Sequence, residues 1–256
     1  MISMRGSVGR GAGAIALAVC VAGSTAGSTA GCAAMVEHSP PARRPPAART
    51  AGAETQPLFT HSVVRVRGFA SSCDQRTETT GFVYAPERVL LNAHAVAGVN
   101  RDLEVVLDDG RRFAARVVAF DPEVDAAVLR APGLTAQPLR LTRAARTAAV
   151  VVGYPKGADA PVVIPATVGP DQPADSYDIY DRERVSLRVH RFLGAAVEPG
   201  MAGAPLVTGG DRAMGMVFAV DTERAAVGYA LTAAQIEAVA AAGENATTAV
   251  PHDPCS

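Results

Sequence analysis

The stretch Thr80–His94, TGFVYAPERVLLNAH, decides the fold of this chain. It contains two short apolar runs, Thr80–Ala85 and Val89–His94, and the break between them holds Pro86, a pattern typical of two strands joined by a turn. Similar runs, bounded by Asp, Gly or Pro, recur on both sides. They predict further strands at Ser62–Phe69, Leu103–Leu107, Phe113–Phe120, Ala126–Arg130, Pro138–Leu141, Ala148–Tyr154, Val162–Val168, Arg184–Arg191, Ala204–Thr208, Met214–Val220 and Ala226–Leu231.

The number and spacing of these runs predict the fold class. Two of them are separated by Asp109-Gly110, a dipeptide that favours a tight β-hairpin turn. About a dozen short strands with almost no helical periodicity between them predict an all-β pair of barrels rather than an α/β sheet. One helix is expected near the end, where Thr232 can cap a helix that runs to about Ala242 and Gly243 would end it.

The first 34 residues have the composition of an export signal. Two arginines precede a weak apolar segment at Ala12–Ala22, and the small residues of Gly23–Ala34 form a cleavage zone. We therefore expect the mature protein in the periplasm or cell envelope, or secreted. Thr29-Ala30-Gly31-Cys32 resembles a bacterial lipobox with Thr in place of the usual Leu. Lipidation of Cys32 and ordinary cleavage after Ala33 or Ala34 both stay open.

The amino-acid composition limits the classes of partner that the protein is expected to bind. The chain has 256 residues, 48% of them hydrophobic, and 24 Lys and Arg against 25 Asp and Glu give a net charge of -1. This balance offers no excess of cations for a phosphate backbone, so nucleic acid is not an expected partner. After the predicted signal no apolar stretch is long enough to span a bilayer, so contact with a membrane is expected only through an N-terminal lipid anchor. Residues 35–56 are rich in Pro, Ala and Arg and are expected to be an extended linker in front of a domain at 57–256.

The cysteines predict a disulfide. Cys20 and Cys32 fall in the export signal, which leaves Cys73 and Cys255 in the mature domain. Two thiols in an oxidising compartment are expected to pair. A metal site is the weaker interpretation, because two Cys without His at ligand spacing cannot complete a zinc shell. No metal and no cofactor are expected.

Three separated motifs carry the chemistry. Leu91-Asn92-Ala93-His94-Ala95-Val96 follows a strand, Val124-Asp125-Ala126-Ala127-Val128-Leu129 opens another, and Pro199-Gly200-Met201-Ala202-Gly203-Ala204-Pro205-Leu206 lies near the end. The order His, Asp and Gly-rich loop is that of chymotrypsin. Over Pro57–Ala242 the chain resembles the trypsin-like serine peptidases.

Finer features narrow the resemblance. Asp178-Ile179-Tyr180, the late Cys255 and the run from Gly215 to Ala233 are most similar to the periplasmic domain of actinobacterial membrane-bound acid-resistance serine proteases. The resemblance implies two six-stranded antiparallel barrels, at 57–142 and 145–231, followed by the helix.

The resemblance also implies roles for two residues. A serine hydroxyl needs a neutral His as general base, and a buried carboxylate must orient that His. His94 would be the base and Asp125 its orienting partner. Asp121 is the competing carboxylate, but it precedes a Pro and is better explained as a turn residue. The other histidines, His38, His61, His190 and His252, lack such a context and are expected at the surface.

The third motif departs from the family at the decisive position. Active members have Gly-Asp-Ser-Gly-Gly-Pro or Gly-Asn-Ser-Gly-Gly-Pro where this chain has Gly200-Met201-Ala202-Gly203-Ala204-Pro205. Ala202 cannot attack a carbonyl, although the N–H groups of Gly200 and Ala202 occupy the oxyanion-hole positions. Natural loss of the nucleophile explains Met201 and Ala204 as well as Ala202. An engineered change of Ser to Ala would explain Ala202 alone.

Substrate preference is indicated only by two features. Ala196 stands where trypsin relatives have an acidic pocket base, so a small or apolar side chain is expected there. Phe218, Ala219 and Val220 would form the edge strand that pairs with an extended peptide, or they are simply core residues.

Three functions remain open. The first is an inactive pseudopeptidase that binds an extended peptide or an envelope protein. The second is an active serine endopeptidase of the cell envelope, if Ala202 replaces a natural Ser. The third is a structural lipoprotein with no function in the cleft.

Overall fold

The computed structural model describes residues 2–4, 58–144, 147–194, 196–252 and 254–255. Apart from a short strand at the N-terminus, the predicted export signal, Cys32 and the linker at 35–56 lie outside these residues. None of the helices in the described ranges has the length and apolar character that a bilayer crossing requires.

The first barrel follows a short 3-10 helix, η1 (Leu58–Ser62). Its strands pair in the order β6-β5-β2-β3-β4-β8-β7. β6 and β7 are separated only by Ala115, whose N–H donates to the carbonyl of Leu103 at 2.9 Å, so they are the two halves of one bent strand. The first half pairs with β5 and the second with β8, which closes the predicted six-stranded barrel. The bounds are β2 (Val63–Ala70), β3 (Gln75–Ala85), β4 (Arg88–Leu91), β5 (Arg101–Val106), β6 (Arg112–Ala114), β7 (Arg116–Asp121) and β8 (Ala126–Arg130).

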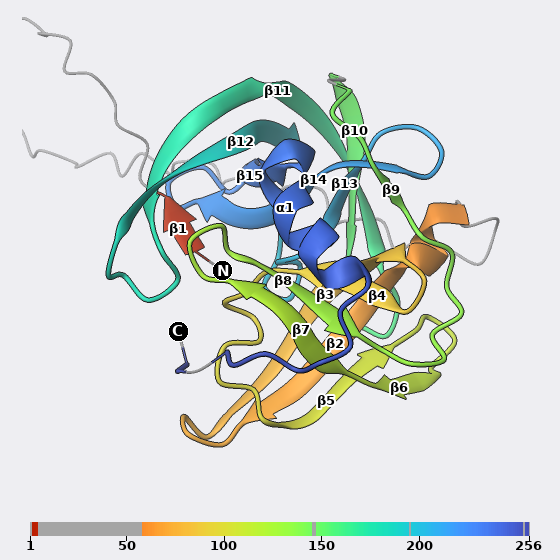
Figure 1. The fold of residues 1–256 in the computed structure, drawn as a ribbon. Coiled ribbons are helices and arrows are strands. Elements are labelled where there is room, and N and C mark those ends of the chain that lie inside the picture. Colours follow the sequence, from red (N-terminus) through yellow and green to blue (C-terminus); the bar gives the residue numbers. More distant parts are fainter. Residues whose placement is uncertain (1, 5–57, 145–146, 195, 253, 256) are drawn as a thin grey trace, which may run out of the picture. The chain divides into compact units, whose positions relative to one another are not determined.

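The second barrel closes through the pairing of β14 with β15 (Figure 1). Two further strands are added to β14, both in parallel: β9 and β1. The sequence did not predict β1, because it lies within the segment interpreted as an export signal. The bounds are β1 (Ile2–Met4), β9 (Arg140–Leu141), β10 (Ala148–Gly153), β11 (Val162–Tyr177), β12 (Arg184–Gly194), β13 (Pro205–Val207), β14 (Arg212–Asp221) and β15 (Val227–Thr232).

A long hairpin joins β11 and β12. Both strands extend beyond the predicted ranges, because the outer part of β11 is polar and exposed and has no apolar alternation to reveal it. The turn of the hairpin reaches the first barrel. There Ile179 is buried in that barrel's core, and its N–H donates to the carbonyl of Pro122 at 3.1 Å. The hairpin therefore supports the turn that leads into β8.

The C-terminal helix α1 (Ala233–Glu244) begins as predicted, since the side chain of Thr232 accepts a hydrogen bond from the N–H of Gln235. The predicted end at Gly243 is wrong. Gly243 lies inside the helix. A Cβ at this position would come within 2.5 Å of Val128 in β8. The glycine thus allows α1 to pack closely against the first barrel, and the helix ends at Glu244, with Asn245 as its C-cap.

One core cluster contains residues of both barrels. Phe82 and Leu90 of the first barrel belong to the same buried cluster as Tyr154 and Phe218 of the second. Burial of apolar surface across the interface stabilises one arrangement of the two barrels. Side chains that project between them are therefore held in a fixed geometry.

Candidate active site

The strongest polar contact between the site motifs joins His94 and Asp125. The Nδ1 atom of His94 lies 2.8 Å from Oδ2 and 3.0 Å from Oδ1 of Asp125, and the backbone N–H of His94 donates to Oδ1 at 3.0 Å. Asp125 is 2% exposed. A buried carboxylate on Nδ1 keeps the proton there and leaves Nε2 as the basic atom, as general-base catalysis requires.

The backbone around Asp125 is arranged to present this carboxylate. Its φ of 57° lies in the left-handed region, and the side-chain amide of Asn92 donates to its carbonyl oxygen at 3.1 Å. Asp121 is a turn residue, as expected, because its Oδ1 accepts the N–H groups of Glu123 and Val124 at 3.0 Å each. Asp125 is therefore the carboxylate that holds the ring of His94.

The loop that carries Ala202 is anchored by its hydrophobic side chains. Met201 is fully buried in the core of the second barrel, together with Ala204. A Cβ on Gly153 would lie 3.0 Å from the Cβ of Ala204 and 3.2 Å from the Cε of Met201, so the packing there is dense. The side chains of Met201 and Ala204 therefore form part of the packed core of the second barrel.

Two threonines of β3 fix the same loop from the first barrel. The N–H of Thr80 and the hydroxyl of Thr79 donate to the carbonyl of Ala202 at 3.1 and 2.8 Å. The hydroxyl of Thr80 also donates to the carbonyl of Gly200 at 2.8 Å. The sequence did not indicate this role, because Thr79 and Thr80 have the character of ordinary strand residues.

His94 and Ala202 line one cleft of about 320 Å³, which also includes Gly200 and Lys156. Gly200 has a φ of 95°, and a Cβ there would lie 2.5 Å from the backbone N of Lys156, so the position requires glycine. Within the described part of the chain, no hydrogen bond uses the N–H of Gly200 or Ala202 as donor. These two N–H groups are thus available to an oxygen bound in the cleft, as in an oxyanion hole.

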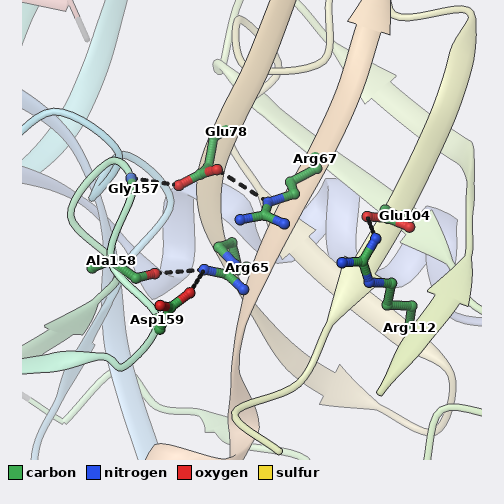
Figure 2. A network of polar contacts seen from close by, with 8 residues as sticks. All are labelled: Arg65, Arg67, Glu78, Glu104, Arg112, Gly157, Ala158 and Asp159. Carbon is green, nitrogen blue, oxygen red and sulfur yellow. Dashed lines mark hydrogen bonds and ion pairs between the residues drawn. The ribbon is translucent and has the colours of Figure 1, made fainter. Parts of the chain in front are cut away.

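A polar clamp between the barrels holds the loop after β10, which packs against Gly200 (Figure 2). Arg65 of β2 is buried, and its guanidinium donates to the carbonyl of Ala158 at 2.5 Å and lies 3.4 Å from Asp159. Glu78 of β3 accepts the N–H of Gly157 at 2.6 Å. The first barrel thereby fixes the backbone on which the oxyanion-hole loop rests.

The predicted substrate-binding residues are placed differently from the catalytic residues. Phe218 and Ala219 are fully buried in the shared core, so their side chains serve packing. Val220 is half-buried and packs against the core of the second barrel. Ala196 is half-buried and does not belong to the lining of the cleft that contains His94. The backbone of Ala219 and Val220 pairs with β15 on one side and with β1 on the other.

The histidine prediction needs one correction. His61 is exposed, as expected, and His252 is half-buried, whereas His38 lies outside the described residues. His190 is buried on β12, where it lies between β11 and β15 and pairs with Asp171 and Ala230. Burial lowers the pKa of His190, against the opposing effects of the Gly169 backbone and of Asp171. A neutral buried histidine explains the finding without a catalytic role.

The predicted disulfide between Cys73 and Cys255 is present, with the Cα atoms 6.7 Å apart. It attaches the C-terminal tail to the loop after β2, and Cys255 lines the cleft beside Ala95 and Ala97. Among the described residues, no group of three or more His, Cys, Asp or Glu side chains could hold a metal ion.

The site geometry agrees with a family match. The model of the trypsin-like peptidase domain matches residues 79–216, which is more than half of the chain and runs from β3 into β14. The chain belongs to the trypsin-like peptidase family. Its two closed barrels and the order of its three motifs are those of a trypsin-like peptidase.

Known proteins support this membership. The serine protease Rv3671c of Mycobacterium tuberculosis is 39% identical over 179 residues, which cover 68% of this chain and 44% of the relative. The matched part thus spans less than half of that protein. The solved active form of the Rv3671c protease has a TM-score of 0.72 at 36% identity and covers 77% of this chain and 86% of that chain. The HtrA-type protease AlgW, at 22% identity and a TM-score of 0.60, shares the fold.

We predict that Gly203 of this trypsin-like peptidase cannot carry a side chain. Its φ is 83°, and a Cβ would lie 2.1 Å from the carbonyl oxygen of Thr80. Gly203→Ala should lower the free energy of unfolding by about 3 kcal/mol or more in urea denaturation, since strain and a backbone clash combine. Gly210→Ala is the control, because Gly210 has a φ of 62° with nothing within 4 Å. It should cost only about 1–2 kcal/mol, and equal losses in both variants would contradict the prediction.

Proposed function

We propose that this chain is an exported, catalytically inactive trypsin-like peptidase homologue that binds an extended peptide in its cleft. One observation carries the proposal: His94, Gly200 and Ala202 line the same cleft, and Asp125 orients His94, but the nucleophile position has only a methyl group. The binding machinery is thus retained where the attacking atom is missing.

The missing atom decides the chemistry. In this family the nucleophile attacks the scissile carbonyl while the histidine takes its proton, and two N–H groups stabilise the resulting oxyanion. In this chain His94 has no hydroxyl proton to accept from position 202, so the covalent step cannot begin. Loss of the nucleophile in a serine peptidase costs about a million-fold in turnover, as measured for subtilisin.

Several features support peptide binding. The N–H groups of Gly200 and Ala202 can bind a carbonyl oxygen of a substrate as well as an oxyanion. The edge of β14 at Ala219–Asp221 accepts a parallel strand, β1, which indicates that an extended segment fits this edge. The TM-score is 0.72 to the active form of the Rv3671c protease and 0.63 to its inactive form, so the overall fold is more similar to the active form.

The neighbours of Ala202 support a natural loss of the nucleophile. Met201 and Ala204 also differ from the family motif, and both are buried in tight contact with the barrel. An isolated exchange of Ser for Ala would have left a polar residue at position 201. The second candidate function is an active endopeptidase in which position 202 is Ser. It is favoured by the relative Rv3671c, which is a serine protease.

Export is supported by two observations. The first 34 residues have the composition of a signal peptide, and the Cys73–Cys255 disulfide requires an oxidising compartment to persist. We propose a location in the cell envelope, with a lipid on Cys32 as the anchor and an extended peptide or an envelope protein as the partner.

The proposal predicts that the protein binds peptides but has no reactive nucleophile. A fluorescent pool of random decapeptides should bind the unmodified protein in an anisotropy titration, while a fluorophosphonate probe labels nothing. Peptides of the same composition with N-methylated backbones are the control, because they cannot donate the main-chain hydrogen bonds of an added strand. The N-methylated pool should bind at least about ten-fold more weakly. Equal binding of both pools, or fluorophosphonate labelling of the unmodified protein, would contradict the proposal.

A further inference from the structure

A second depression continues from the cleft along the first barrel. It has a volume of about 770 Å³ and shares Arg76, Thr77, Glu78 and Lys156 with the cleft that contains His94. A peptide that extends beyond the cleft on this side therefore enters it. We call it the charged groove; its lining is Arg67–Phe69, Arg76–Glu78, Asp102, Glu104, Arg112 and Lys156.

Most charges of the charged groove neutralise one another, as Figure 2 shows. The Nε atom of Arg67 donates to Glu78 at 3.0 Å, and Arg112 donates to Glu104 at 3.4 Å. The second carboxylate oxygen of Glu78 accepts the N–H of Gly157. Both oxygens of Glu78 are thus engaged, which leaves this carboxylate a poor partner for a basic peptide.

Two cations remain, and both lie where the groove meets the cleft. Arg76 and Lys156 are exposed, and neither forms an ion pair with any residue that the structure describes. The remaining acid, Asp102, lines the groove but not the cleft. The junction therefore presents an uncompensated positive charge to a bound peptide.

Both cations are attached to fixed positions. The guanidinium of Arg76 lies over the ring of Phe69, 5.5 Å from its centroid, which restricts its conformations and leaves its edge free to donate. The backbone of Lys156 is fixed because its N–H donates to the carbonyl of Pro199 at 2.7 Å and the next residue is held by Glu78. A cation on a fixed base loses less conformational freedom when it binds a carboxylate.

We propose that the charged groove binds an acidic segment of the peptide held in the cleft, with Arg76 and Lys156 selecting Asp or Glu side chains. Arginine can bind a carboxylate through two parallel hydrogen bonds, and lysine adds a point charge. A basic segment meets repulsion at the same place. This inference rests on the proposed function, since the acidic segment is part of the same extended peptide.

The test uses synthetic decapeptide pools and the unmodified protein. In every pool, one half of the peptide is drawn from Ala, Val and Ser. The other half contains Ser together with one test residue, which is Glu, Gln or Lys. Each pool is made in two versions, with the test half at the N-terminal end or at the C-terminal end of the peptide. Anisotropy titrations at low salt should show the Glu pool, in one of the two orders, binding about five-fold more tightly than the Gln pool. The Lys pool should bind most weakly. The difference should shrink as salt screens the charges.

Variants assign the preference to the two cations. The double change Arg76→Gln and Lys156→Gln should remove the five-fold preference, so that the Glu and Gln pools bind this variant with equal affinity. Arg116→Gln is the matched control, because Arg116 is an exposed cation of the same barrel outside the cleft and the groove, and this variant should keep the preference. Lys156→Glu should shift the preference toward the Lys pool, and thermal melting should confirm that each variant is folded.

Each contrary outcome has a distinct meaning. Equal affinities for the Glu and Gln pools, or a preference that survives the double change, would overturn the proposal that the charged groove binds an acidic segment. Peptide binding in the cleft would still stand. Failure of all pools to bind would overturn the proposed function together with this inference.

Discussion

Ala202→Ser should convert this protein into a fluorophosphonate-reactive peptidase, whereas the unmodified protein should show neither labelling nor hydrolysis. The remaining groups are already arranged, since Asp125 holds Nδ1 of His94 at 2.8 Å and the N–H groups of Gly200 and Ala202 donate to no other group among the described residues. Triad members act as a unit, so restoring the absent one can recover up to about a million-fold in turnover. The readouts are covalent labelling and cleavage of a fluorogenic peptide pool.

Recovery is expected to be partial. Met201 and Ala204 flank the nucleophile and pack tightly into the barrel, and a displacement of about 1 Å can cost a hundred-fold in rate. Adding His94→Ala to the Ala202→Ser variant should abolish labelling again, and adding Asp125→Asn should reduce turnover by about ten-thousand-fold. Hydrolysis by the purified unmodified protein that persists after His94→Ala would overturn the assignment, because triad chemistry could not then be responsible.

Removal of the disulfide is expected to have the largest effect on stability. Cys73 and Cys255 are separated by 182 residues, and on the chain-entropy model a cross-link of this span stabilises the fold by about 5 kcal/mol. Replacing both cysteines with Ser should lower the free energy of unfolding in urea by about this amount. Reductant should reproduce the loss in the unmodified protein and have no effect on the double variant.

Removal of the disulfide should also affect peptide binding in the cleft. The tail that ends in Cys255 is held by non-covalent contacts as well: the N–H of Gly98 donates to the carbonyl of His252 at 2.7 Å, and the N–H of Val250 donates to that of Val117 at 3.0 Å. Because Cys255 lines the cleft, loosening the tail should weaken peptide binding. A double variant that loses less than about 1 kcal/mol would show that these contacts hold the tail without the cross-link.

Local patterns predicted much of the fold. Apolar runs and their bounding turns indicated the strands of both barrels, and Thr232 was correctly predicted as a helix cap. The disulfide followed from the number of thiols left after the export signal. Each of these features depends on residues that are neighbours in the sequence or on the number of cysteines. A single sequence is therefore enough to predict it.

Contacts between distant parts of the chain were not predictable in this way. The bonds from Thr79 and Thr80 to the Ala202 loop, and the clamp formed by Arg65, join residues that the chain separates by a whole barrel. The outer half of β11 has no apolar alternation because its faces are polar. His190 was wrongly placed at the surface: it lies on β12 between β11 and β15, and a local pattern does not reveal this pairing of distant segments.

The position of α1 has a consequence for the order in which the protein can mature. The helix follows the second barrel in sequence, yet Tyr84 and Arg88 of the first barrel donate to its carbonyls at Ala240 and Gly243, at 2.7 and 2.8 Å. A chain that leaves a ribosome or a secretion pore N-terminus first cannot cover this face of its first barrel until α1 (Ala233–Glu244) has emerged. Until then the apolar surface around Val128 stays uncovered, so the two barrels should mature together and folding assistance should matter until α1 has docked.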